Sequence, residues 1–195
     1  MKIATLQPHA TEHETSMLRL TTTAAILLAS AGLALAQGAP QQPPQAAGAP
    51  QTPPPPPARG PSFDLALEAA QTALEAGKAA DQKVAVTVID SAGVLKAVLV
   101  SDGTGARAVQ NSNFKGQAAL AFKESSGELA EQVKSNKDLA EKVAANPNYL
   151  ARAGAVLIKV NDEIIGVIGV GGARGSEKDE QYALAGLQKV QSRLK

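Results

Sequence analysis

The sequence has no cysteine and no tryptophan, and its two histidines and two methionines all lie at or before Met17 in a chain of 195 residues. Without cysteine the chain forms no disulfide and offers no thiolate nucleophile or lipid-anchored cysteine. From Gln37 onward, histidine and methionine are absent as well. That part of the chain therefore lacks the imidazole and thiolate ligands of the usual zinc, copper and iron–sulfur sites, and it has no histidine for a catalytic triad.

The sequence also has no large excess of charge of either sign. The 19 basic and 18 acidic residues leave a net charge of +1. Proteins that bind nucleic acids or anionic membranes usually carry a strongly basic patch. We therefore expect no nucleic-acid partner and no polybasic membrane surface.

The N-terminal third contains a targeting signal. Residues 1–16 are polar, and we interpret them as an untranslated or dispensable extension before a start at Met17. Residues 17–36 read as a signal peptide, with Arg19 before an apolar run and Ala34-Leu35-Ala36 as a small-residue cleavage site. The apolar run is shorter than the roughly 18–20 residues that span a bilayer, so an uncleaved anchor is the weaker alternative. We expect a periplasmic or secreted protein with no stable membrane insertion after cleavage.

Residues 37–61 are rich in proline, glutamine, alanine and glycine, and positions 53–57 are all proline. Such a segment has too few apolar side chains to bury a core and forms an extended, semi-rigid spacer. Binding to a proline-recognising partner is the alternative interpretation. We expect a disordered linker over 37–61 and a folded domain over 62–195.

Hydrophobic periodicity within the domain predicts an α+β fold, of the profilin or PAS kind, with helices flanking a mainly antiparallel sheet of two hairpins. The predicted elements are a helix over 62–79, strands over 84–90 and 94–100, a helix over 106–123, two short helices that begin at Ser125 and Ser135, a hairpin over 155–170 and a helix from Ser176. Ser125 with Glu128, Ser135 with Asp138, and Ser176 with Asp179 are the predicted capping pairs.

The stretch from Val156 to Gly175 is the predicted centre of the fold. Asn161-Asp162 is typical of a two-residue hairpin turn, and the run 164–170 is apolar enough for a strand covered on both faces. The glycine-rich loop over 169–175 is either a tight strand-to-helix turn or an anion site. Its spacing differs from G-x-G-x-x-G, and acids at the start of the next helix would repel a phosphate, which favours the turn.

Several single residues remain open to two interpretations. Asp102 lies in an Asp-Gly turn and Lys115 is either a solvated lysine or a site residue. Ser125 and Ser126 are either helix caps or ligand contacts. Tyr149 and Tyr182 carry the only phenols, and phenolate is the one conventional heme-ligating side chain left after Gln37.

The domain resembles the GlcG/HbpS-like heme-binding, or heme-degrading, family over about Phe63 to Leu194. The matching segments are 86–90 with Gly93, Asp102-Gly103, Lys115 with Ala118-Ala119 and Phe122, Glu128-Leu129, Asn146-Pro147, 165–171, Asp179-Glu180 and 183–186.

This resemblance implies a self-associating domain with heme as a cofactor in some members. The family threonine proposed to contact heme iron corresponds to Ser126. The sequence departs from the family at Ser101, at Gly154 to Ile158 and at Tyr182. Together with the residues above, the resemblance marks a set of candidate ligand-binding residues: Asp102, Lys115, Phe122, Ser126, Tyr149, Arg152 and Gly171.

Three hypotheses follow for the function. The first is a secreted or periplasmic protein that binds heme or a related tetrapyrrole at a homo-oligomer interface. The second is a self-associating structural or interaction module without a cofactor. The third is an enzyme that uses Asp90, Asp102 and Lys115 for acid–base chemistry. The sequence favours a binding protein over an enzyme and names neither a catalytic residue nor a metal ligand.

Overall fold

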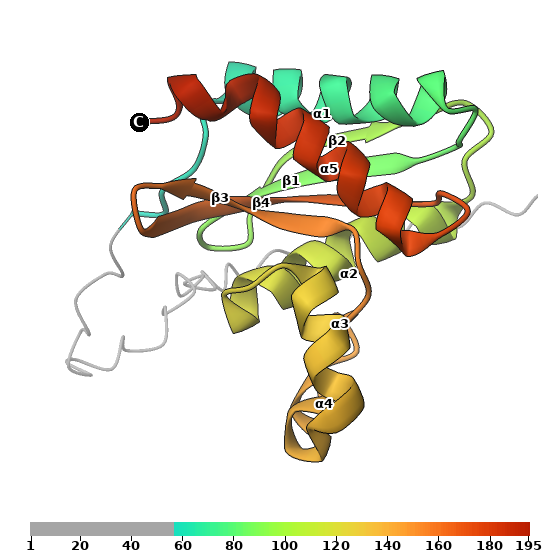
Figure 1. Ribbon diagram of the computed structural model, residues 1–195. Coiled ribbons are helices and arrows are strands. Elements are labelled where there is room, and N and C mark those ends of the chain that lie inside the picture. Colours follow the sequence, from blue (N-terminus) through green and yellow to red (C-terminus); the bar gives the residue numbers. More distant parts are fainter. Residues whose placement is uncertain (1–56) are drawn as a thin grey trace, which may run out of the picture. The chain divides into compact units, whose positions relative to one another are not determined.

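The computed structural model describes residues 57–195, which form a four-stranded sheet flanked by five α-helices (Figure 1). In chain order the elements are α1 (Phe63–Ala79), β1 (Ala85–Asp90), β2 (Leu95–Val100), α2 (Ala106–Phe122), α3 (Ser126–Ser135), α4 (Lys137–Ala144), β3 (Ala155–Val160), β4 (Glu163–Gly171), α5 (Ser176–Val190) and a 3-10 turn, η1 (Gln191–Arg193). The strand order is β2-β1-β4-β3, and each neighbouring pair is antiparallel. The predicted α+β class and the sheet of two hairpins are confirmed.

The two central strands are β1 and β4, and both are covered on the two faces of the sheet. All six residues of β1 are buried, as are the last seven of β4. The β3–β4 turn places Asn161 at φ 53°, a conformation that asparagine tolerates better than most residues. The predicted buried strand and its Asn-Asp turn are confirmed.

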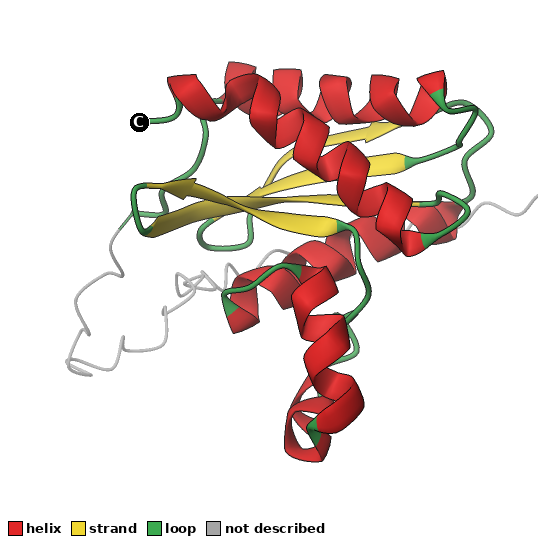
Figure 2. Cartoon of the chain, in the orientation of Figure 1, coloured by secondary structure: helices red, strands yellow, loops and turns green. Residues whose placement is uncertain are grey.

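The helices form two layers around the sheet (Figure 2). Helices α1 and α5 lie on one face, and α2 lies on the other with α3 and α4 continuing beyond it. Close approach of helix to sheet depends on glycine: a Cβ atom at Gly169 would lie 2.1 Å from the Ser112 carbonyl oxygen of α2. At Gly186 it would lie 2.4 Å from the Ala69 carbonyl oxygen, where α5 crosses α1. The absence of a side chain at these two positions therefore allows α2 to pack closely on β4 and α5 to pack closely on α1.

Two predicted caps are wrong. The Ser125–Glu128 capping box at the start of α3 is present, but α4 is capped by Asn136, whose side chain accepts from Leu139 N–H, and not by Ser135. Asparagine is at least as good an N-cap as serine. Helix α5 begins at Ser176, so its N-cap is Gly175, which has no side chain to cap the helix; Asp179 makes other contacts described below.

The expectations for residues 1–16, for the signal peptide and for most of the linker over 37–61 lie outside the described residues. Among residues 57–195, no helix combines the length and hydropathy needed to cross a membrane.

Candidate functional site

A buried ion pair joins the two helical layers at one end of the sheet. Lys115 of α2 places its Nζ 2.7 Å from Asp179 Oδ2 of α5, and both side chains are nearly inaccessible, at 2% and 4% exposure. Lys115 Nζ also donates to the Val170 carbonyl oxygen at 3.1 Å, and Asp179 Oδ1 accepts from Ala173 N–H at 2.9 Å. The pair thus fixes the end of β4 and the loop that leads into α5.

The charges around this pair act in opposite directions. Burial has the largest effect and lowers the pKa of the Lys115 ammonium, because the charged form loses its hydration. Asp179 raises that pKa through its charge and its hydrogen bond, Arg152 lowers it, and Glu180 raises it. The 2.7 Å contact would by itself suggest a raised pKa, but burial is the stronger influence and the net direction is downward.

Gly154 covers the ion pair. Its φ of 135° is favoured only by glycine, and an added Cβ would lie 2.5 Å from Lys115 Nζ and 2.7 Å from the Val170 carbonyl oxygen. Gly154 N–H donates to Glu180 Oε2 at 3.2 Å. The segment before β3 is therefore a thin backbone layer between the ion pair and the surface.

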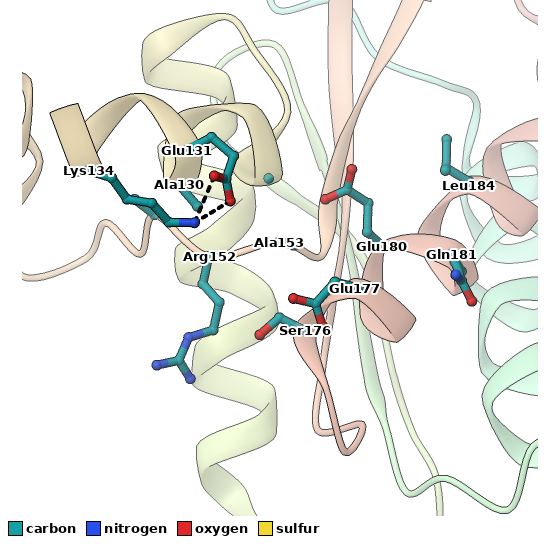
Figure 3. A pocket seen from close by; sticks show the side chains of 12 residues that line it. Ala130, Glu131, Lys134, Arg152, Ala153, Ser176, Glu177, Glu180, Gln181 and Leu184 are labelled. Carbon is teal, nitrogen blue, oxygen red and sulfur yellow. Dashed lines mark hydrogen bonds and ion pairs between the residues drawn. The ribbon is translucent and has the colours of Figure 1, made fainter. Parts of the chain in front are cut away.

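A cavity of about 460 Å³ lies on the outer side of that layer, between α3 and the first turns of α5 (Figure 3). We call it the α3–α5 slot. Its lining residues are Gly127, Ala130, Glu131, Lys134, Ala151, Arg152, Ala153, Ser176, Glu177, Glu180, Gln181 and Leu184. Four of these are glycine or alanine, so a flat ligand can approach the backbone closely.

The slot has a charged rim. Glu131 and Lys134 pair with each other at 2.6 Å on α3, and Glu180 is held by the Gly154 N–H. Arg152 is exposed and forms no ion pair with any residue between 57 and 195. Figure 3 shows Arg152 between α3 and the start of α5, with Ser176 and Glu177 on its α5 side. Its guanidinium is available for a carboxylate of a ligand.

The slot fits a tetrapyrrole in three respects: its volume lies within the range of small-molecule pockets, its floor is small and apolar, and its rim offers Arg152 for an acidic side chain of the macrocycle. Its lining contains no imidazole, thiolate, thioether or phenol. Iron ligation from within the slot would have to use an oxygen of a glutamate, of Ser176 or of Gln181, or the Lys134 amine.

The structure brings three of the predicted site residues to this end of the sheet. Lys115 lies beneath the slot and Arg152 lines it. Ser126 is fully buried beside them, and its Oγ accepts from Ala155 N–H at 2.8 Å. The Ser126 hydroxyl therefore anchors the start of β3 and does not face the slot.

The other candidates lie elsewhere. Phe122 and Tyr149 pack edge to face with ring centroids 5.8 Å apart, in the cluster that holds α3 and α4 to α2. Asp102 lies at a shallow recess beside Lys83. Gly171 is packed against α2, where a Cβ atom would lie 2.6 Å from the Ala108 carbonyl oxygen.

The three residues proposed for acid–base chemistry are not assembled. Asp90 closes the β1–β2 turn by accepting from Ala92 and Val94 N–H groups, whereas Asp102 follows the far end of β2. Lys115 is paired with Asp179 instead. Among residues 57–195, no three His, Cys, Asp or Glu side chains converge in a way that would hold a metal ion.

Sequence reasoning missed Asp179 as the partner of Lys115, and it missed Gly154 and Glu180 as the layer above them. A signal was present. Asp179 falls at helical spacing with the buried residues Tyr182, Ala183, Gly186 and Val190 of α5, and Lys115 falls with Ala108, Ser112 and Ala119 of α2. A charged residue on the buried face of each of two helices predicts a buried pair.

The chain is similar to a known protein family and to several solved structures. The model of the family described as "Haem degrading protein HbpS-like" matches residues 62–188. A structure of a double mutant of HbpS from Streptomyces reticuli is 27% identical, with a TM-score of 0.64 over 76% of this chain and 99% of the other. Among curated proteins, no significant match was found.

Two further solved structures share the fold. The Klebsiella pneumoniae protein ORFY is 20% identical with a TM-score of 0.63, covering 69% of this chain and 92% of its own. A structure described as a PduOC:heme complex is 18% identical with a TM-score of 0.60, covering 66% and 94%. At these identities the similarity shows the fold alone.

Proposed function

Because the chain belongs to the HbpS-like family of haem-degrading proteins, we propose that it is a secreted or periplasmic protein that binds heme or a related tetrapyrrole in the α3–α5 slot. The observation that carries the proposal is the slot itself, which combines a floor of glycine and alanine with the exposed Arg152 at its rim, an arginine that forms no ion pair within residues 57–195. The heme complex of the PduOC protein, which has the same fold, supports the choice of ligand.

The chain's own residues have distinct parts in this binding. Small residues of the floor let the macrocycle lie against the backbone, and the half-exposed side chain of Leu184 contacts its edge. Arg152 pairs with an acidic side chain of the ligand. Bound heme would supply an iron centre, and because the slot offers only weak iron ligands, binding would be driven mainly by burial of apolar surface. Leu184 remains 39% exposed, and we propose that a second copy of the chain covers it, so that the ligand lies at the interface of a homo-oligomer.

A hemin titration of the full chain, followed by visible absorption, tests the proposal. We expect a shifted Soret band that saturates, and an affinity at least tenfold weaker in Ala130→Trp, which fills the slot. Ala144→Trp is the matched control, since Ala144 is exposed at the end of α4 and lies outside the slot. An unchanged spectrum at micromolar hemin, or equal loss in both variants, contradicts heme binding in the slot.

The arginine has its own test. Arg152→Ala should weaken hemin binding and leave binding of a tetrapyrrole without free carboxylates unchanged, because the guanidinium recognises a carboxylate. Arg107→Ala changes an exposed arginine of α2 outside the slot and should have no effect. Equal weakening of both ligands by Arg152→Ala would rule out this role.

A self-associating module without a cofactor is the second candidate function, and the edge of the sheet favours it. Strand β2 pairs only with β1 among the described strands, and Leu95, Val98 and Val100 on it are 53%, 40% and 44% exposed. An exposed apolar edge strand is a surface for strand pairing. Antiparallel pairing of two β2 strands about Ala97 would set Lys96 opposite Val98, so that the two like charges do not meet.

Light scattering on the full chain separates the two functions. The cofactor-free module predicts that the wild-type protein forms a discrete oligomer and takes up no hemin. It also predicts that Val98→Lys is a monomer. Gln110→Lys, at an exposed position of α2, is the control for added charge. A wild-type protein that is monomeric at all concentrations contradicts self-association through β2.

A further inference from the structure

A second cavity lies between the middle of α2 and the loop after α4. It measures about 390 Å³ and is lined by Asn113, Gln117, Asn146, Asn148 and Tyr149. We call it the amide recess. It shares no lining residue with the α3–α5 slot. Every lining side chain is a neutral hydrogen-bonding group, and none is a carboxylate, an ammonium, a guanidinium or an aliphatic chain.

Separate contacts hold three of these side chains in place. Gln117 Nε2 donates to the Gly93 carbonyl oxygen at 3.1 Å, which leaves Gln117 Oε1 as an acceptor. Asn146 Oδ1 accepts from Asn148 N–H at 2.9 Å, which leaves the Asn146 amide group as a donor. The ring of Tyr149 is fixed by its edge-to-face contact with Phe122. The recess therefore presents donors and acceptors whose positions are set before any ligand arrives.

Asn113, a further lining residue, lacks a hydrogen-bond partner for its side-chain oxygen among residues 57–195. This oxygen, Asn113 Oδ1, is buried. An unsatisfied buried acceptor is destabilising, and buried polar groups in proteins usually have a hydrogen-bond partner. Asn113 lines the recess, so its amide is one of the groups that a ligand bound there would contact.

From this chemistry we infer that the amide recess binds a neutral, polyhydroxylated ligand, namely a saccharide. A lining without formal charge gives no strong attraction to phosphate, carboxylate or ammonium groups. A lining without aliphatic side chains gives an apolar ligand little to pack against. Sugar hydroxyls both donate and accept, which matches amides that offer both and the Tyr149 hydroxyl, which can also do both.

The inference is independent of heme binding, because it rests on other residues. Its test is nuclear magnetic resonance of the ¹⁵N-labelled full chain with N-acetylglucosamine, maltose and lactose as probes. Side-chain amide signals of Asn113, Gln117, Asn146 and Asn148 should shift with at least one sugar and fit a dissociation constant in the millimolar range. Gln110, an exposed amide of α2 outside the recess, should not shift.

Variants locate the binding. Asn146→Ala should weaken the sugar affinity by about tenfold, a loss of about 1.4 kcal/mol, while Gln110→Ala leaves it unchanged. Asn148→Ala, at an exposed position, gives the same test in a variant that disturbs packing less. Absence of shifts at about 50 mM of all three sugars, or unchanged affinity in Asn146→Ala and Asn148→Ala, would overturn the inference.

Discussion

Lys115 and Asp179 are 64 residues apart in the sequence, come from helices on opposite faces of the sheet, and meet at 2.7 Å with almost no exposure to solvent. A buried ion pair is costly to desolvate, but it is more costly still to leave one of its members alone. The pair therefore fixes α2 and α5 relative to each other across the end of the sheet where the α3–α5 slot lies.

Removal of one member should show this specificity. Lys115→Met leaves the Asp179 carboxylate buried with one hydrogen bond fewer and should lower the free energy of unfolding by about 3–5 kcal/mol. The double variant Lys115→Met with Asp179→Leu should recover part of that loss, because no charge remains buried. Urea unfolding measures both. If the loss of unfolding free energy in the double variant equals the sum of the losses in Lys115→Met alone and Asp179→Leu alone, the two residues are not coupled.

The lowered pKa of Lys115 makes stability depend on pH in a defined direction. Between that lowered pKa and the ordinary value of 10.5, the unfolded chain binds a proton that the folded chain has lost. Stability rises with pH wherever the unfolded state binds more protons. Relative to the double variant without Lys115 and Asp179, the wild-type protein should therefore gain stability as the pH approaches 10.5.

Unfolding at a series of pH values from about 7 to 10 tests this sign. The opposite result would be a wild-type protein that loses stability relative to the double variant over the same interval. It would mean that the effect of Asp179 outweighs burial and raises the pKa of Lys115.

Gly154 should tolerate no side chain. Gly154→Ala puts a methyl group 2.5 Å from Lys115 Nζ at a φ of 135°, and we expect a loss of at least about 2 kcal/mol in the free energy of unfolding. Gly105→Ser is the matched control, because nothing lies within 4 Å of a Cβ there and serine is a good N-cap for α2. Its effect should stay within about 0.5 kcal/mol. Equal stability of the two variants would refute the crowding at Gly154.

Ser126 provides a test of its predicted role as a heme contact. The structure places its hydroxyl on Ala155 N–H, so Ser126→Ala leaves a buried N–H unpaired and should cost about 1–3 kcal/mol of stability. Its hemin affinity should remain within about twofold of wild type. Ser126→Thr keeps the hydroxyl and is the comparison variant. A large loss of hemin affinity with unchanged stability would instead assign Ser126 to the ligand.

The sequence predicted individual elements well where local signals agree. The strands start within one residue of the predicted positions, because β-branched runs bounded by Gly93 and Asn161-Asp162 specify a pleated segment and its turns locally. It misplaced the cap of α4, because Ser135 and Asn136 are both suitable caps, and that of α5, because the helix starts one residue earlier than a Ser176 cap requires and leaves Gly175 at the N-cap. At Asp179 the carboxylate satisfies a distant lysine instead of its own helix.

By itself, the sequence determined the α+β class, the two hairpins, the absence of histidine and cysteine chemistry after Gln37, and the family. These follow from periodicity, turn chemistry and residue types, which are properties of short segments. Only the tertiary structure decided that Lys115 and Asp179 pair under Gly154, that Arg152 lines a slot between α3 and α5, and that Phe122, Tyr149, Asp102 and Gly171 lie apart from it. Those relationships depend on how the helices pack on the two faces of the sheet and on each other. Glycines set these packing distances: Gly169 packs against α2 and Gly186 against α1, both far away in the sequence.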